Sequence, residues 1–386
     1  MSKNKSPIIE IHGTGIHNRG AELMSIAISE KIKSIYPDAQ LVVSSNFGFP
    51  SDISRYGFRP TFSIESLSKK AFISLFAGIF TGKTVNPAKV DVVLDASGFA
   101  FSDQWGARGA KKLYYKMNIL GRSSQLLILM PQALGTFNND DVKDGCKKLF
   151  ERAALVFPRD TISYQCVTSL YNEKNNKIKQ CPDFTIAVKP KADESIQLPK
   201  NFVGIVPNIR MLDKLDNKES YLSFLRKSVD TIVKYQMTPV FIVHDAHEDS
   251  NVVKLLGEGY QDFLIVQHED PQVLKSILGK AQFVIGSRFH ALVSTLSQGV
   301  PCIGAGWSHK YPELFSDFST RESLIDDLAD LEALENQISL LSQSNYRSEK
   351  SNEIMLAATK LKGQINEMWV IVLNEIEQHL NKTRNK

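Results

Sequence analysis

Three basic side chains within one short stretch, Arg288, His290 and Lys310, have the chemistry of an anion site. An arginine guanidinium binds a carboxylate or phosphate through two parallel hydrogen bonds, and a lysine adds a second positive charge. Histidine is the side chain best suited to moving a proton near neutral pH. Their clustering predicts a site that binds a small anion and transfers a proton. The alternative interpretation is a core histidine at a helix start beside a solvated lysine.

Residues 281–310 have the pattern of a strand, a turn, a helix and a second strand. The apolar run at 283–285 is broken by Gly286 and Ser287, and apolar residues then recur at helical spacing until Pro301 ends the helix. In an open α/β sheet such a turn lies at the carboxyl end of a strand, where these folds bind ligands. The helix N-terminus also favours an anion. Ser287 is therefore included among the candidate substrate-binding residues.

The composition is that of a globular protein large enough for two domains, with 386 residues and a net charge of +4. This mild charge suits anionic ligands or, weakly, a membrane surface, and it does not call for nucleic acid as a partner. The four cysteines form no C-x-x-C pair, so we expect free thiols in a reducing compartment. The basic start has no apolar region after it. A secretory signal is therefore not expected, and the predicted location is cytoplasmic.

Apolar strand patterns alternate with helical patterns along most of the chain, with a long polar loop after the second strand. The expected strands are residues 7–13, 41–45, 90–97, 125–130, 155–157, 202–206, 240–243 and 263–266. The expected helices are residues 21–36, 64–80, 142–150, 162–170, 221–235, 252–256 and 273–278. Such alternation predicts two parallel sheets and an α/β fold. The segment 64–80 is apolar nearly all round, which fits either a buried helix or a patch that enters a bilayer from one side.

A polar, proline-containing stretch at residues 188–201 has the composition of a linker and predicts a domain boundary. We therefore expect an N-terminal α/β domain at 1–190 and a C-terminal one at 200–345. A long amphipathic helix at 350–383 closes the chain, and we expect it to pack across the domains.

A glycine-rich turn follows the first expected strand and places Asn18 and Gly20 at the entrance of the next helix. Asparagine is a favoured N-cap residue. Two interpretations stay open: plain helix capping, and a loop that binds a ligand with Asn18 as the candidate residue. The glycine spacing does not match a dinucleotide-binding fingerprint.

The segment H-D-A-H-E-D at residues 244–249 contains side chain types that bind divalent metals. Its spacing matches none of the standard zinc patterns, and Asp and His also cap helices after a strand. We therefore predict no metal site and expect a polar loop facing an interdomain cleft. Arg210, just past the strand at 202–206, is a further candidate anion ligand, with an exposed surface arginine as the alternative.

The motif G-S-R-F-H-A-L at residues 286–292, followed by Q-G-V-P and then a lysine, resembles the signature of the polysaccharide pyruvyl transferase family. The resemblance extends from the turn at Asn18 to about Phe318. It implies two Rossmann-like domains in a GT-B-like arrangement, with an interdomain cleft between them. The N-terminal domain would then be the acceptor side and the C-terminal domain the donor side.

The resemblance also implies the reaction. Members move a group derived from enolpyruvate from phosphoenolpyruvate onto sugar hydroxyls, so we expect a pyruvate ketal on a cell-surface polysaccharide or its precursor. Arg288, Arg210 and Lys310 would bind the donor, and His290 would act as general acid or acid/base. No cofactor is required by this chemistry. The acceptor would be a glycan or a lipid-linked oligosaccharide, and the latter would bring the protein into peripheral contact with the inner face of the cytoplasmic membrane.

The chain departs from the commonest family pattern in one place, because Ala21 and Glu22 follow the glycine that many members follow with Asp. A nucleotide-sugar glycosyltransferase on the same fold is one alternative. Retaining enzymes of that kind usually place glutamates on this strand–helix unit, and no acidic residue lies between Gly286 and Pro301. A sugar- or anion-binding protein without catalysis is the other alternative.

Overall fold

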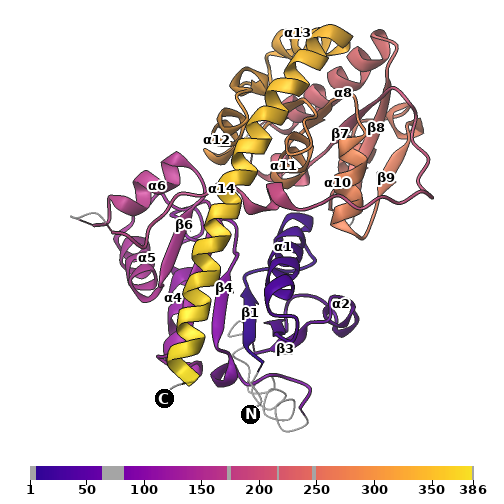
Figure 1. Ribbon diagram of the computed structural model, residues 1–386. Helices are drawn as coiled ribbons and strands as arrows, with labels where there is room; N and C mark the ends of the chain where they lie inside the picture. The colour runs from indigo at the N-terminus through magenta and orange to yellow at the C-terminus, as the bar shows by residue number, and fades with distance from the viewer. Residues whose placement is uncertain (1–5, 63–81, 172–174, 215–216, 246–248, 385–386) are drawn as a thin grey trace. The chain divides into compact units, whose positions relative to one another are not determined.

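The computed structural model describes residues 6–62, 82–171, 175–214, 217–245 and 249–384 (Figure 1). The described chain forms two compact units. Unit 1 comprises residues 1–184 and 364–386, and unit 2 comprises residues 185–363. The apolar segment 64–80, for which we weighed a buried helix against a membrane patch, lies outside the described residues.

Unit 1 contains a parallel sheet of six strands in the order β3-β2-β1-β4-β5-β6. Its strands are β1 Ile8–His12, β2 Gln40–Ser44, β3 Arg59–Thr61, β4 Val92–Asp95, β5 Leu126–Gln132 and β6 Leu155–Pro158. Its helices are α1 Arg19–Ile35, α2 Pro50–Arg55, α4 Arg108–Tyr115, the π-helical η2 Lys116–Leu120, α5 Asp140–Arg152 and α6 Thr161–Thr168, with a 3-10 turn η1 at Pro87–Lys89. All seven residues of β5 are buried, as expected for a strand covered on both faces.

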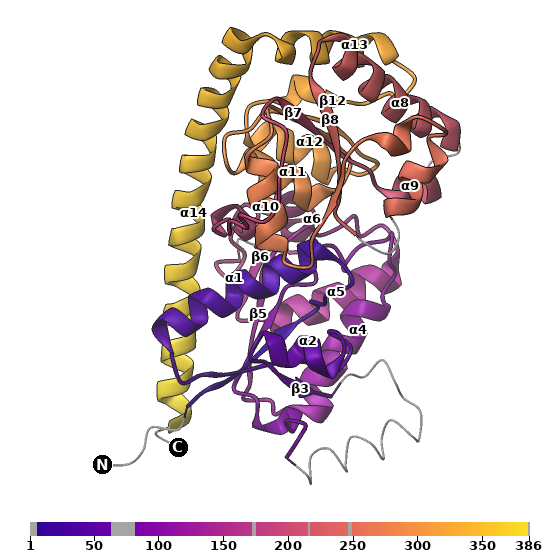
Figure 2. The ribbon, with the colours of Figure 1, turned by 90° about the vertical axis from the view of Figure 1, so that its right-hand side faces the viewer.

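Unit 2 repeats this topology with the strand order β12-β11-β10-β7-β8-β9. Its strands are β7 Phe202–Val206, β8 Thr238–Val243, β9 Ile265–Gln267, β10 Val284–Gly286, β11 Cys302–Ala305 and β12 Leu324–Ile325. Its helices are α7 Ile209–Lys214, α8 Lys218–Lys234, α9 Asp249–Leu255, α10 Pro271–Gly279, α11 Phe289–Leu296, α12 Lys310–Asp317 and α13 Leu331–Ser342, with 3-10 turns η3 Phe184–Ala187, η4 Tyr260–Asp262 and η5 Arg321–Ser323. Figure 2 shows α10 and α11 on one side of β7 and β8, and α8 with α13 on the other.

Both sheets therefore have the Rossmann strand order, in which the chain starts in the middle and winds outward twice. The order reverses between β1 and β4 in unit 1 and between β7 and β10 in unit 2. Open α/β sheets bind ligands in the crevice at such a reversal, beyond the carboxyl ends of the strands. The two reversal points are the places where chemistry is expected.

The predicted α/β class with two parallel sheets is confirmed. The prediction of a long polar loop after the second strand was wrong, because this segment contains α2 and the short strand β3. The helix expected at 350–383 is part of α14, Ser344–Arg384, of which residues up to Gly363 belong to unit 2 and those from Gln364 to unit 1. No helix among the described residues is long and apolar enough to cross a membrane.

An ion pair between Glu10 on β1 and Lys116 in η2 is buried in unit 1, where the two side chains are 1% and 6% exposed. Burial alone would raise the pKa of Glu10, but the charge of Lys116 and the hydrogen bond to His12 lower it to about 2. Glu10 therefore stays ionised and depends on Lys116 to remain buried.

Replacing Lys116 with methionine leaves this carboxylate buried without its cation. We expect the free energy of unfolding of unit 1 to fall by about 3 kcal/mol or more, measured by urea denaturation followed by circular dichroism. The matched control is Lys112→Met, one helical turn earlier, where the lysine is only partly buried. Its expected loss is below about 1 kcal/mol. Equal losses in the two variants would contradict this account of the ion pair.

Candidate functional site

The reversal point of the second sheet brings together segments that are 79 residues apart in sequence. Strands β7 and β10 are paired in parallel, with Val206 opposite Gly286. The residues that follow each strand, Asn208 and Ser287, therefore meet at the same sheet edge. The Asn208 side-chain amide donates a hydrogen bond of 2.8 Å to the carbonyl of Ser287.

Ser287 is fully buried and forms the turn that leads into α11. Its carbonyl also accepts a 2.8 Å hydrogen bond from the Tyr311 hydroxyl. Its own hydroxyl lies 2.6 Å from the hydroxyl of Tyr221, which in turn accepts from the Asn208 backbone N–H at 2.9 Å. Ser287 thus fixes the position of the next residue, Arg288, and its predicted direct contact with a substrate stays a prediction.

Arg288 is the N-cap residue of α11 and is held by a buried carboxylate. Its Nε donates to Asp249 Oδ2 at 2.8 Å and its Nη2 donates to Asp249 Oδ1, which gives a two-bond pair. Asp245 Oδ2 lies 3.6 Å from Nη2. Burial alone would lower the pKa of Arg288, but the hydrogen bonds and charge of Asp249, with the charge of Asp245, raise it. The guanidinium is therefore a permanent cation in a fixed orientation.

The carboxylate of Asp249 accepts hydrogen bonds from three parts of the chain. Besides Arg288, it accepts from the backbone N–H of Ile209 at 3.0 Å and from that of Asp245 at 3.0 Å. The polar segment 244–249 thus contacts Arg288 through the carboxylates of Asp245 and Asp249. Its other members at 246–248 lie outside the described residues.

Lys310 and His290 both lie next to the ring of Phe289. The Lys310 ammonium is 5.2 Å from the centroid of the Phe289 ring, 5.5 Å from that of Trp307 and 5.3 Å from that of Tyr311. The His290 ring centroid is 5.4 Å from that of Phe289. Cation–π attraction holds an ammonium near aromatic faces, so these rings position the Lys310 charge beside the start of α11. The structure thus places His290 and Lys310 against the ring of Phe289, the residue that follows Arg288.

The remaining candidates have other surroundings. Arg210 lies on α7 with half of its side chain exposed, and it forms a 3.0 Å ion pair with Asp213. Asn18 belongs to unit 1 and caps α1, accepting a 2.9 Å hydrogen bond from the Gly20 N–H. The capping interpretation of Asn18 is therefore seen directly. The proposed substrate contacts of both residues stay predictions.

Glu22, whose role the sequence left open, is fully buried in α1. It accepts hydrogen bonds from Arg19 at 2.6 Å and from Arg55 at 3.1 Å, and from the hydroxyl of Tyr56. Burial raises the pKa of Glu22, although Tyr56 and the two arginines oppose that rise. The side chain joins α1 to α2.

Comparison with known families decides the identity of the chain. The family model described as polysaccharide pyruvyl transferase matches residues 18–309. The chain belongs to the polysaccharide pyruvyl transferase family. The match includes Arg210, Arg288 and His290 and ends one residue before Lys310. A comparison of this pyruvyl transferase family member with curated proteins finds no match.

Solved structures of similar fold cover almost the whole family member. One is MnaA of S. aureus in a structure with UDP, with a TM-score of 0.63, 12% identity and coverage of 98% of this chain and 97% of that one. Another is the UDP-GlcNAc 2-epimerase of Methanocaldococcus jannaschii, with a TM-score of 0.57, 12% identity and coverage of 88% and 93%. A third is HepE of Anabaena in complex with UDP and glucose, with a TM-score of 0.57, 10% identity and coverage of 96% and 100%. The fold is GT-B-like, as predicted.

Asp249 was not singled out as an ion-pair partner of Arg288 from the sequence. Its replacement with alanine removes the acceptor of four hydrogen bonds and leaves the Arg288 cation without its main partner. We expect the free energy of unfolding of unit 2 to fall by about 3 kcal/mol or more. The control is Asp213→Ala, because Asp213 pairs with Arg210 at an exposed position and its loss should cost less than about 1 kcal/mol. Urea titrations of both variants make the measurement, and a small loss for Asp249→Ala would show that Arg288 is held by other contacts.

Proposed function

We propose that the protein transfers a pyruvyl group from phosphoenolpyruvate to sugar hydroxyls of a cell-surface polysaccharide or its precursor, forming a pyruvate ketal. The observation that carries the proposal is the family match across residues 18–309, which includes the turn where Arg288 and His290 stand beside Lys310. The position of this turn at the reversal point of a Rossmann-type sheet supports it further.

The chemistry of the donor sets what the site must supply. Phosphoenolpyruvate carries a carboxylate and a phosphate on one enol carbon. A proton added to its methylene group forms a methyl group and makes the enol carbon an oxocarbenium-like electrophile. One sugar hydroxyl attacks this carbon, phosphate leaves, and a second hydroxyl closes the ketal. Of the two hydroxyl protons lost, one replaces the proton given to the methylene group and the other leaves on the phosphate as HPO4²⁻. The site therefore needs cations for two anionic groups and an acid beside the methylene.

Arg288 is assigned to one anionic group of the donor. Asp249 accepts hydrogen bonds from Nε and Nη2 of the guanidinium. Nη1 has no acceptor among the described residues, so we assign it to the donor. A cation fixed in this way loses little conformational freedom when it binds a ligand. Because Asp249 and Asp245 offset its charge, a second cation is needed, and Lys310 supplies it.

His290 is assigned the role of general acid, which protonates the methylene group of the donor. It would then act as general base and take a proton from an attacking sugar hydroxyl. It is half-buried in the first turn of α11, against Phe289, two residues from Arg288. An imidazole in this place can deliver a proton to a donor whose anionic groups are held by Arg288 and Lys310.

Replacing His290 with alanine removes the proposed acid and should lower kcat by about 10²–10⁴-fold while the protein stays folded. Phosphate release from phosphoenolpyruvate in the presence of cell-surface glycan precursors is the measurement, with circular dichroism as the folding check. His379→Gln on α14 is the control and should keep full activity. Normal turnover by His290→Ala would remove His290 from the mechanism.

Replacing Lys310 with methionine removes one charge and keeps the aliphatic chain against the three rings. We expect KM for phosphoenolpyruvate to rise by about tenfold, the value of one charge-assisted hydrogen bond. Lys254→Met, at an exposed position on α9, should leave KM unchanged. An unchanged KM in Lys310→Met would exclude Lys310 as a donor contact.

The same assay separates the alternatives. UDP release from a nucleotide sugar with no use of phosphoenolpyruvate would favour a glycosyltransferase, a class suggested by neighbours solved with UDP. Binding of sugar or phosphoenolpyruvate without turnover would favour a non-catalytic protein. A lipid-linked acceptor would be met at the inner face of the cytoplasmic membrane.

A further inference from the structure

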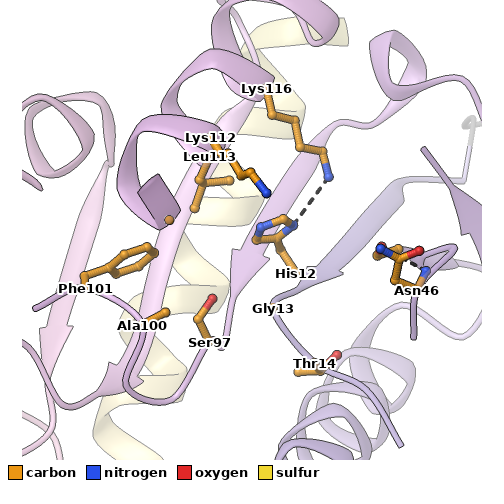
Figure 3. A pocket seen from close by; sticks show the side chains of 12 residues that line it. His12, Gly13, Thr14, Asn46, Ser97, Ala100, Phe101, Lys112, Leu113 and Lys116 are labelled. Atoms are coloured by element: carbon orange, nitrogen blue, oxygen red, sulfur yellow. Dashed lines mark hydrogen bonds between the residues drawn. The ribbon is translucent and has the colours of Figure 1, made fainter. Parts of the chain in front are cut away.

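A cavity of about 310 Å³ lies at the reversal point of the first sheet, within unit 1. It opens beyond the carboxyl ends of three neighbouring strands, where His12 ends β1, Ser44 ends β2 and Ser97 follows β4 (Figure 3). The helical segment from α4 into η2 contributes Lys112 and Lys116. Its lining residues all belong to unit 1, whereas Arg288 belongs to unit 2.

A buried charge network fixes the orientation of His12. Its Nδ1 lies 3.2 Å from Glu10 Oε1, and the same carboxylate oxygen accepts a hydrogen bond from Lys116. Lys116 Nζ lies 3.4 Å from the same His12 nitrogen, which is the contact drawn in Figure 3. Because Glu10 is ionised, can only accept and makes the shorter contact, we assign the Nδ1 proton to a hydrogen bond with Glu10. The remaining nitrogen, Nε2, then has a lone pair. Figure 3 shows it on the side of the ring away from Lys116.

Donors for an anion line the same cavity. Lys112 is partly buried and pairs with no acidic side chain among the described residues, unlike Lys116. The Thr14 hydroxyl oxygen, in the glycine-rich turn after β1, is buried with no hydrogen-bond partner in the described part of the chain. A buried hydroxyl of this kind costs free energy unless a ligand or water satisfies it.

A ligand that matches these groups must both donate and accept. His12 Nε2 requires a hydroxyl donor; a sugar phosphate has hydroxyl donors apart from its phosphate, whereas the phosphate dianion HPO4²⁻ has a single P–O–H group. Lys112 requires an anion, which a neutral sugar lacks. We propose that this cavity binds a phosphorylated monosaccharide unit, with its phosphate on Lys112 and one sugar hydroxyl donating to His12 Nε2. Naming this ligand as the acceptor rests on the proposed function, whereas its binding does not.

Calorimetric titration of the full chain tests the inference, with glucose 1-phosphate as the probe and glucose and inorganic phosphate as separate arms. The sugar phosphate should bind more tightly than either arm. Lys112→Gln should weaken its binding about tenfold, the loss of one charge-assisted hydrogen bond. Lys111→Gln is the matched control, because Lys111 pairs with Asp141 and does not line this cavity, and this variant should bind normally.

His12→Phe separates the two halves of the ligand. It keeps a ring in place and removes both ring nitrogens, so it should abolish the advantage of glucose 1-phosphate over inorganic phosphate while leaving phosphate binding unchanged. Equal affinity of the wild type for the two probes, or wild-type affinity in Lys112→Gln, would overturn the inference. Displacement of glucose 1-phosphate by phosphoenolpyruvate would also overturn it, by assigning the cavity to the donor, and would leave pyruvyl transfer itself intact.

Discussion

The buried pair between Asp249 and Arg288 is the interaction on which the geometry of the second unit depends. One carboxylate accepts hydrogen bonds from the Arg288 side chain and from the backbone N–H groups of Ile209 and Asp245. These groups follow β10, β7 and β8, which are strands of one sheet. The pair therefore connects three strand ends and sets where α11 begins. A buried pair is costly to assemble and more costly to break, which makes it a means of fixing position more than a source of stability.

The first unit also has a buried ion pair at its reversal point, but its carboxylate and its cation come from other elements than in unit 2. At its reversal point the carboxylate is Glu10, on the first strand, and the cation is Lys116, from the helical segment after β4. In unit 2 the cation follows β10, and the carboxylate starts the helix after β8. In both units the buried pair lies where the strand order reverses. In unit 1 the pair holds His12, and in unit 2 Arg288 is itself a member of the pair. The two proposed sites differ in their side chains, which are an imidazole and a lysine in unit 1 and a guanidinium, an imidazole and a lysine in unit 2.

Much of the fold followed from local pattern. Strand β7 was predicted at its observed bounds, since the run at 202–206 is apolar and ends at Pro207. The unit from β10 to β11 was predicted because glycines and a proline mark its turns. Strand β3 was missed, since Arg-Pro-Thr has no apolar run, and α4 was missed because it buries only Ala110 and Leu113. The site predicted from Arg288, His290 and Lys310 stays a prediction, and the buried partners of the charged residues were not foreseen. Asp249 is 39 residues from Arg288, and Glu10 is 106 residues from Lys116, so no local pattern links them.

The most direct measurement follows the donor carbon itself. Phosphoenolpyruvate labelled with carbon-13 at its enol carbon is incubated with the protein and glycan precursors extracted from the cells that make it, and the products are examined by NMR. Pyruvyl transfer predicts that the label moves to a quaternary ketal carbon within a saccharide, with a new methyl group beside it. A label that stays in phosphoenolpyruvate or appears only in free pyruvate, while a nucleotide sugar is consumed, would contradict the account.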